Sequence, residues 1–307
     1  MNSDRTHRQL SAARRPMPLA RLLLLAGISA ALGLHGVASA QSGVGHYASV
    51  NGLQLYYEVY GQGQPLILLH GGLGSIEMFS PILPQLAKGR QVIAVDLQGH
   101  GRTADANRPL SYEAMADDVA ALLRSLKLNR ADVMGYSLGG EVALQTAIRH
   151  PEAVRKLVLV STAFRQDGWY PEVLAGEAQM GPQSAEMTKQ TPLYTLYAQL
   201  APRPQDWTQL HYELHDLLTQ NYDWSKGVAA LKMPILLVVG DSDAVWTNHA
   251  VQFFELLGGG QKDGGYDGSG MAKSQLAILP GLTHYTIFAS PALATTVTPF
   301  LDAPTAK

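Results

Sequence analysis

The sequence has 307 residues and no cysteine, so disulfide bonds, a cysteine nucleophile and thiolate metal sites are excluded. A hydrophobic fraction of 46% with 16% charged residues is typical of a chain that folds around a large apolar core. The formal net charge is −2 and no long basic block follows the first forty residues, which argues against nucleic-acid binding.

The first forty residues predict an export signal that is separate from the folded body. Five arginines precede the apolar run Leu22–Leu34, which is shorter than a membrane span, and the small residues Ala38-Ser39-Ala40 follow it. We expect cleavage before Gln41, with an uncleaved membrane anchor as the alternative. Removal of residues 1–40 leaves 18 positively and 24 negatively charged residues, a formal net charge of −6. This charge suits a periplasmic or secreted protein without stable membrane association.

Strand-like and helix-like segments alternate through the rest of the chain. The pair Asn51-Gly52 predicts a hairpin turn, and helical apolar spacing after Ser111 predicts a capped helix. Apolar strands separated by helices imply an α/β fold with a mostly parallel, doubly wound sheet of about eight strands. The predicted strands are Tyr47–Val50, Leu53–Tyr60, Pro65–Leu69, Gln91–Asp96, Ala131–Tyr136, Lys156–Val160, Pro234–Val239 and Gln275–Leu279, and the predicted helices include Tyr112–Leu126 and Glu141–Arg149.

Two segments interrupt this alternation. Residues 164–228 contain no core strand but hold three of the four tryptophans, so we expect a mainly helical insert. The insert divides the body into a core of residues 41–163 and 229–307. The second segment, Gly258–Gly270, is rich in glycine and predicts a mobile surface loop. It lacks the regular acidic ladder of a calcium loop.

A candidate nucleophile lies in the motif Gly135-Tyr136-Ser137-Leu138-Gly139, which follows a predicted strand and precedes a predicted helix. A sharp turn between strand and helix exposes the serine side chain, and the flanking glycines prevent backbone collisions. The start of the helix adds positive potential and free N–H groups near the reacting oxygen. In this context the motif predicts Ser137 as a nucleophile.

A serine nucleophile needs a base, and His284 is the best-placed candidate. It follows the last predicted strand, so it lies at the same carboxyl edge of the sheet as Ser137. We expect His150 and His249 to serve structure. His211 and His215 share a helical face but lack a third ligand, so no metal site is predicted.

The base in turn needs an acid, and Asp241 and Asp243 both follow the strand Pro234–Val239. We favour Asp243, because an aspartate in the position of Asp241 commonly bonds its own turn. The chain order of the predicted triad is then Ser137, Asp243, His284.

The glycine-rich loop His70-Gly71-Gly72-Leu73-Gly74 follows a strand at the same edge and predicts an oxyanion hole. We expect the N–H groups of Gly72 and Leu138 to be the donors, with Leu73 as the alternative to Gly72. His70 is expected to brace the loop.

These motifs resemble those of the α/β-hydrolase superfamily over nearly all of the chain after residue 40. The resemblance implies Asp243 as the triad acid and a helical cap at residues 164–228. In that family a glycine often precedes the catalytic histidine, whereas Thr283 stands in this position here. The matching pieces are His70-Gly71-Gly72, Asp96-Leu97-Gln98-Gly99-His100-Gly101, Gly135-Tyr136-Ser137-Leu138-Gly139-Gly140, Gly240-x-x-Asp243 and His284.

The resemblance also bears on the reaction. Dehalogenases and epoxide hydrolases of this superfamily have aspartate at the nucleophile position, so Ser137 favours acyl transfer. We expect hydrolysis of a small to medium carboxylic ester through an acyl-enzyme at Ser137, with no metal or organic cofactor. A lactonase similar to enol-lactonases, a C–C bond hydrolase, a thioesterase, a cofactor-free haloperoxidase and an acyltransferase remain alternatives on the same fold. A non-catalytic binding protein would lack a triad member or block the oxyanion loop, and no member is missing.

Overall fold

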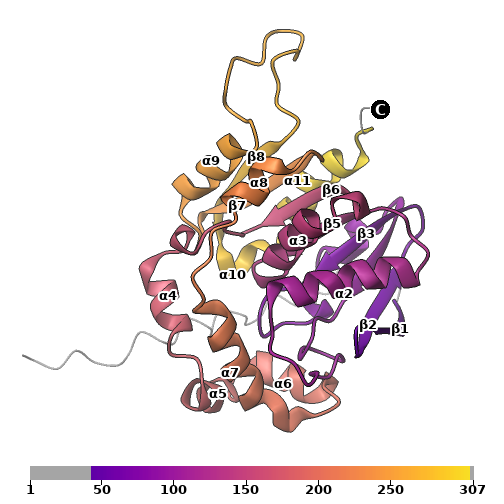
Figure 1. The fold of residues 1–307 in the computed structure, drawn as a ribbon, viewed down its shortest axis with the longest axis vertical. Coiled ribbons are helices and arrows are strands. Elements are labelled where there is room, and N and C mark those ends of the chain that lie inside the picture. The colour runs from indigo at the N-terminus through magenta and orange to yellow at the C-terminus, as the bar shows by residue number, and fades with distance from the viewer. Residues whose placement is uncertain (1–42, 305–307) are drawn as a thin grey trace, which may run out of the picture. The chain divides into compact units, whose positions relative to one another are not determined.

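The computed structural model describes residues 43–304 of the chain (Figure 1). The predicted signal peptide and its cleavage site lie outside the described residues. Within residues 43–304, no helix has both the length and the apolar character needed to cross a bilayer.

The fold is built on one eight-stranded sheet with the order β1-β2-β4-β3-β5-β6-β7-β8. β1 and β2 are antiparallel to their neighbours, and the remaining pairs are parallel. This confirms the predicted α/β fold with a mostly parallel sheet. The strands are β1 Val44–Val50, β2 Leu53–Tyr60, β3 Gln64–Leu69, β4 Arg90–Val95, β5 Ala131–Tyr136, β6 Val154–Val160, β7 Ile235–Ser242 and β8 Gln275–Thr283.

The hairpin at the edge of the sheet turns at Asn51 and Gly52, whose φ angles are 45° and 85°. Two consecutive positive φ angles match the twist of the flanking strands, which is why an Asn-Gly pair predicts this turn. The antiparallel pairing of β1 with β2 follows directly from it.

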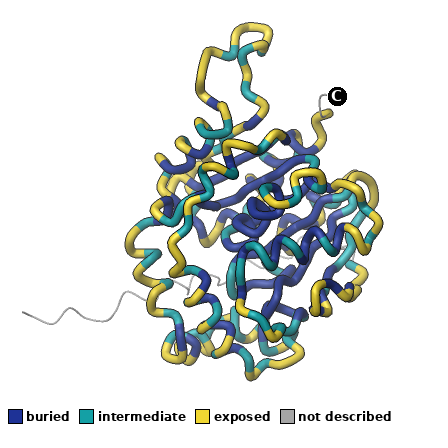
Figure 2. The backbone as a smooth tube through the Cα atoms, viewed as in Figure 1, coloured by how far each residue is buried: buried dark blue, intermediate teal, exposed yellow. Residues whose placement is uncertain are grey.

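Helices cover both faces of the sheet, as Figure 1 shows. Alternate residues of β3 point to opposite faces, so Ile67 packs with the core under α2 and α3 while Leu68 packs with the core under α1 and α11. Figure 2 shows that the central strands and α3 are buried. The helices on these faces are α1 Leu83–Leu86, α2 Tyr112–Ser125, α3 Leu138–Arg149, α8 Ser225–Ala230, α9 Thr247–Leu256, α10 His284–Ile287 and α11 Pro291–Asp302.

Several boundaries differ from those predicted by one to four residues, and three of them lie near the predicted site residues. α3 begins at Leu138 and not at Glu141, because Ser137 ends the strand turn and the helix includes Gly139 and Gly140 despite their low helix propensity. β8 continues to Thr283, four residues beyond the predicted end. β4 ends at Val95, so Asp96 follows the strand.

The segment between β6 and β7 is mainly helical and contributes no strand to the sheet. Trp207 is 1% exposed and packs against Tyr194 and Tyr197, and its indole N–H donates to the carbonyl of Ala185 at 3.1 Å. Trp207 therefore holds the helices of this segment together. The remaining helices of the segment are α4 Pro171–Glu177, α5 Pro182–Thr188, α6 Pro192–Leu200 and α7 Trp207–Leu218.

The glycine-rich segment Gly258–Gly270 lies at the surface between α9 and β8, where Figure 1 shows a loop that projects from the fold. Tyr266 in this loop is fully exposed. The location agrees with the predicted surface loop.

Candidate active site

The strand register brings the predicted site residues to one edge of the sheet. Tyr136 pairs with Val160, so Ser137 and Ser161 follow their strands side by side. Ser242 pairs with Thr283, so Asp243 and His284 are likewise adjacent in space. These four residues meet because the carboxyl ends of parallel strands share an edge of the sheet.

Ser137 occupies a strained turn between β5 and α3. Its φ angle is 52°, a left-handed conformation that is uncommon for a residue with a side chain. A Cβ atom at Gly135 would lie 2.0 Å from the carbonyl oxygen of Gly139, so the turn cannot form with a larger residue at position 135. The turn places the Ser137 hydroxyl at the N-terminus of α3, as the motif predicts.

Ser137, His284 and Asp243 form a continuous hydrogen-bonded chain. His284 Nε2 lies 3.0 Å from Ser137 Oγ, and His284 Nδ1 lies 3.0 Å from Asp243 Oδ1. An ionised Asp243 accepts from Nδ1–H, which leaves the lone pair of Nε2 facing the Ser137 hydroxyl. The structure thus places together the three residues that the sequence singled out as a triad.

Asp243 is buried and held by several donors. Ser161 Oγ donates to Oδ2 at 2.6 Å, and the N–H groups of Gly240 and Ala244 donate at 2.9 and 2.8 Å. Burial acts to raise the pKa of this carboxyl, but the hydrogen bonds from His284 and Ser161 outweigh it, so the pKa of Asp243 lies below its usual value. Asp243 is therefore ionised near neutral pH.

The structure also distinguishes the two candidate acids. Asp241 is exposed and its Oδ1 accepts from the N–H of Gly281 at 3.0 Å, so it stabilises the chain around the end of β8. Of these two aspartates, Asp243 is the one that is hydrogen-bonded to His284.

His284 is the first residue of α10, directly after β8. Thr283 caps this short helix by accepting the N–H of Tyr285 at 3.2 Å, which gives the threonine before His284 a structural role. The Tyr136 hydroxyl donates to the His284 carbonyl at 2.7 Å, so the strand before the nucleophile also holds the histidine.

The predicted oxyanion loop lies beside the nucleophile. A Cβ atom at Gly71 would lie 3.3 Å from Ser137 Cβ, and one at Gly72 would lie 3.8 Å from Leu138 Cδ2. Among residues 43–304, no acceptor is hydrogen-bonded to the N–H of Gly72, Leu73 or Leu138. These donors are therefore free to bind a negatively charged oxygen.

His70 braces this loop through both ring nitrogens. Its Nε2 accepts the N–H of Leu97 at 3.0 Å and its Nδ1 donates to the carbonyl of Gly71 at 2.8 Å. Burial and the nearby His100 lower the pKa of His70 to about 3, so the ring is neutral. This arrangement agrees with the bracing role expected from the sequence.

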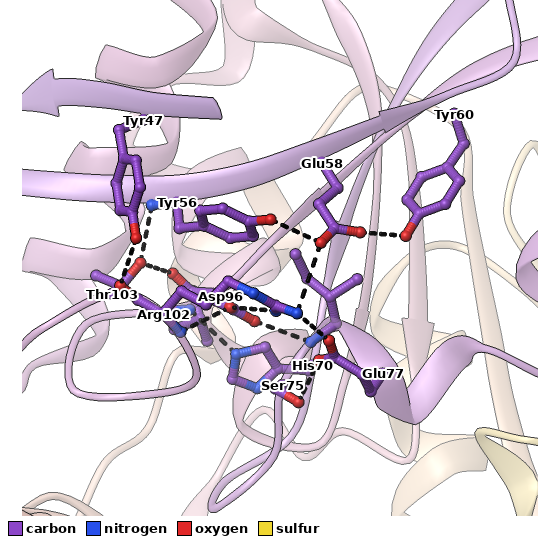
Figure 3. A network of polar contacts seen from close by, with 12 residues as sticks. Tyr47, Tyr56, Glu58, Tyr60, His70, Ser75, Glu77, Asp96, Arg102 and Thr103 are labelled. Carbon is purple, nitrogen blue, oxygen red and sulfur yellow. Dashed lines mark hydrogen bonds and ion pairs between the residues drawn. The ribbon is translucent and has the colours of Figure 1, made fainter. Parts of the chain in front are cut away.

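A second polar network, shown in Figure 3, holds the far end of the same loop. Asp96 accepts the N–H of Ile76 through Oδ1 and the N–H of Arg102 through Oδ2, both at 2.9 Å. The Arg102 guanidinium also pairs with Glu77 at 2.5 Å. The motif from Asp96 to Gly101 thus serves to position the loop after β3.

Three further histidines have structural contacts. His150 pairs with Asp117 at 2.7 Å, and His249 accepts the N–H of Phe164 at 3.1 Å. His211 is hydrogen-bonded to Ser184 and Thr188 within the segment between β6 and β7. No group of three or more potential metal ligands occurs in the described chain.

Sequence reasoning missed Ser161 and a buried group around Trp169, Tyr222 and Glu141. A polar residue directly after the buried strand β6 was the one available signal for Ser161. The contacts of Trp169 and Tyr222 join segments more than fifty residues apart, so no local pattern announces them.

Comparisons with known proteins agree with this geometry. A family model described as alpha/beta hydrolase fold matches residues 64–214. The AB hydrolase superfamily protein YisY of Bacillus subtilis is 30% identical over 225 residues, which cover 66% of this chain and 83% of YisY.

Other relatives match over shorter regions. A 2-hydroxymuconate semialdehyde hydrolase of a Pseudomonas species is 41% identical, over 34% of this chain and 38% of its own length. A pimeloyl-[acyl-carrier protein] methyl ester esterase of Neisseria meningitidis is 43% identical, over 36% of this chain and 42% of its own length. The match therefore spans less than half the length of these two relatives.

Solved structures show the same fold at lower identity. The carboxylesterase CesB of Bacillus subtilis has a TM-score of 0.64 at 22% identity, covering 85% of this chain and 92% of that protein. The enol-lactonase of Burkholderia xenovorans has the same TM-score and identity, covering 84% and 100%.

Proposed function

Since the chain belongs to the α/β hydrolase superfamily and is a serine hydrolase, we propose that it hydrolyses a small to medium carboxylic ester through an acyl-enzyme at Ser137. The observation that carries the proposal is the 3.0 Å contact between Ser137 Oγ and His284 Nε2, with Asp243 on the opposite side of the imidazole. This arrangement supplies a nucleophile, a base and an acid in a single chain of hydrogen bonds.

Acylation begins when His284 Nε2 takes the proton of the Ser137 hydroxyl and Oγ attacks the ester carbonyl. The carbonyl oxygen becomes an oxyanion, which the N–H groups of Gly72 and Leu138 stabilise. Collapse of the tetrahedral intermediate breaks the ester bond, and the alcohol leaves with the proton from His284. The negative charge of Asp243 stabilises the imidazolium during both transfers.

Deacylation repeats these steps with water. His284 removes a proton from water, the hydroxide oxygen attacks the acyl carbon, and Ser137 Oγ leaves with the proton from His284. The product is a carboxylic acid, and the enzyme returns to its starting state.

An ester substrate is supported by the chemistry of the nucleophile and by the relative whose name describes a methyl ester esterase. The hydrolase of a semialdehyde shows that similar sequences also act on other compounds. A panel of esters, lactones, thioesters and a C–C bond substrate therefore tests the proposal. Preference for an ester supports it, and turnover of another class alone contradicts it.

The helical segment 164–228 is proposed to cover the reacting serine as a cap. Trp169, at the start of this segment, packs against the imidazole of His284 with ring centroids 5.6 Å apart. An aromatic side chain beside the base offers apolar contact area to a substrate. The core would then consist of residues 41–163 and 229–307.

Export to the periplasm or the medium is a further part of the proposal. It is supported by the arginine-rich start, the apolar run and the small residues before Gln41. Cleavage at that position would release the folded domain from its signal.

The decisive experiment is labelling with a fluorophosphonate, which reacts with an activated serine. Wild type should be labelled at Ser137, and the Ser137→Ala variant should be neither labelled nor active while its circular dichroism melt is unchanged. Turnover by Ser137→Ala would contradict the proposed nucleophile.

A further inference from the structure

Trp169 is fixed to the loop that carries the triad acid. It forms an antiparallel bridge with Val245, two residues after Asp243. The indole N–H of Trp246 donates to the Trp169 carbonyl at 3.1 Å, and the Trp246 main-chain N–H donates to the Gly168 carbonyl at 2.9 Å. The backbone of Trp169 therefore has a defined position relative to Asp243.

The side chain of Trp169 contacts the base of the triad. Its ring meets the imidazole of His284 at an interplanar angle of 79°, in a T-shaped arrangement. Such edge-to-face contacts are favourable and directional. They restrict rotation of the imidazole ring about its Cβ–Cγ bond.

Trp169 is also linked by hydrogen bonds to α3, the helix that begins directly after Ser137. The indole N–H of Trp169 donates to the Tyr222 hydroxyl at 3.0 Å, and the Tyr222 hydroxyl donates to Glu141 Oε1 at 2.8 Å. Glu141 lies one helical turn after Ser137, whose carbonyl accepts the N–H of Glu141 at 3.1 Å. The chain of contacts thus returns to the residue that carries the reacting hydroxyl.

Glu141 is an unusual residue for this position. Its side chain is 1% exposed, and its Oε2 has no hydrogen-bond partner in residues 43–304. Burial raises the pKa of Glu141 to about 8, although the hydrogen bond from Tyr222 opposes this shift. A buried carboxyl destabilises the fold unless it is well paired, so its position beside the nucleophile points to a role in the site.

We propose that Tyr222 is a positioning residue for His284, acting through Trp169 on one side and held by Glu141 on the other. The inference rests on the proposed ester hydrolysis. The Tyr222 hydroxyl both accepts from Trp169 and donates to Glu141, so its removal frees the indole and leaves the Glu141 carboxyl without that donor. The Trp169 ring can then shift away from the imidazole of His284, which becomes less well fixed. Small displacements of a catalytic group reduce the rate strongly.

The first test is Tyr222→Phe, which removes one oxygen atom and keeps the ring. We expect kcat to fall about tenfold with KM changed less than about threefold, because the reacting geometry and not substrate affinity is altered. The pH profile of kcat/KM should also move, since the environment of the imidazole changes. Tyr266→Phe, the same substitution in the projecting loop, is the matched control and should behave as wild type.

The second test asks whether the residues act as one unit. Trp169→Phe keeps an aromatic ring but removes the N–H donor, so it should resemble Tyr222→Phe. The double variant should be no slower than the slower single variant, because both changes break the same hydrogen bond. If the fold-loss in kcat of the double variant equals the product of the two single losses, the two residues act independently and the shared role is contradicted.

The third test uses rescue by a conservative change at Glu141. Glu141→Gln keeps an acceptor for the Tyr222 hydroxyl, whereas Glu141→Leu removes it. We expect Glu141→Gln to retain at least about fivefold more activity than Glu141→Leu, with both proteins folded by circular dichroism. Equal losses in both variants would show that the acceptor is not required.

These results separate the inference from the proposed function. If wild type reacts with the fluorophosphonate and hydrolyses an ester but Tyr222→Phe equals wild type in kcat and pH profile, the positioning role is wrong and the hydrolase function stands. If wild type is neither labelled nor active on any ester, the proposed function itself fails.

Discussion

Ser161 donates its hydroxyl to Asp243 at 2.6 Å, on the carboxylate oxygen that His284 does not contact. Ser161 has a φ angle of 53°, close to the 52° of Ser137 on the neighbouring strand. The two serines thus follow paired strands with similar φ angles. Ser137 contacts the base His284, and Ser161 contacts the acid Asp243.

This contact predicts a measurable role for Ser161. Ser161→Ala removes a hydrogen bond to a charged carboxylate, so we expect a loss in kcat of about three- to tenfold. The pKa of Asp243 should rise, because the hydrogen bond from Ser161 helps to hold it low. Steady-state kinetics at neutral pH measure the loss in kcat, and a carboxyl 13C NMR titration below pH 5 measures the pKa of Asp243. Unchanged kinetics would show that the remaining donors suffice.

The two neighbouring aspartates should differ sharply. Asp243→Asn cannot stabilise the imidazolium and favours the wrong tautomer, so we expect a loss in kcat of about 10⁴-fold. Asp241→Asn should lose less than about tenfold, since Asp241 contacts the chain near Gly281 and not the base. A larger loss in Asp241→Asn would reverse the assignment.

Glu141 predicts a pH-dependent effect on stability. The pKa of Glu141 is raised to about 8 in the folded protein, against about 4.3 in the unfolded chain, so unfolding releases a proton between these values and stability falls as pH rises through this window. Glu141→Gln cannot ionise. We therefore expect its free energy of unfolding, relative to wild type, to increase by about 4 kcal/mol from pH 4 to pH 8.

Urea denaturation at several pH values measures this difference. Glu152→Gln, at an exposed position, is the control and should track wild type at every pH. A parallel pair of curves for wild type and Glu141→Gln would contradict the raised pKa.

Tryptophans of the segment between β6 and β7 should separate into two roles. Trp169→Leu should change the ratio of kcat/KM between aryl and short-chain esters by about tenfold, because this ring lies beside His284. Trp207→Leu should instead lower Tm by about 4–8 °C with the ratio preserved, because this ring is buried among the helices. Loss of Tm without a change of ratio in Trp169→Leu would leave this ring a packing role only.

Export predicts a defined mature N-terminus. Expression of the full chain in a bacterial host, followed by intact-mass measurement, should give a periplasmic or secreted protein that starts at Gln41. A protein that keeps residues 1–40 and sediments with membranes would favour an anchor.

Much of the fold and the triad could be predicted because their signals are local. The Asn51-Gly52 turn, the cap at Ser111 and the turn around Ser137 each depend on a few consecutive residues. The mostly parallel sheet followed from alternation of strands and helices, and parallel strands bring their carboxyl ends to one edge.

Helix and strand ends near the site were less predictable. The start of α3 at Leu138 and the extension of β8 to Thr283 depend on packing and on pairing with β7, which override the low helix propensity of glycine and the usual end of a strand near proline. The sequence therefore predicted that this helix and this strand exist, but not the residues at which they begin or end.

The sequence by itself determined the order Ser137, Asp243, His284 and the candidate donors of the oxyanion hole, because each follows a strand with a local motif. Only the tertiary structure decided that Asp243 and not Asp241 contacts His284, and that Ser161 holds the other carboxylate oxygen. It also brought Trp169, Tyr222 and Glu141 together. A hydrogen bond requires atoms within about 3 Å in a suitable direction, and for residues far apart in the chain the packing of the whole domain sets that geometry.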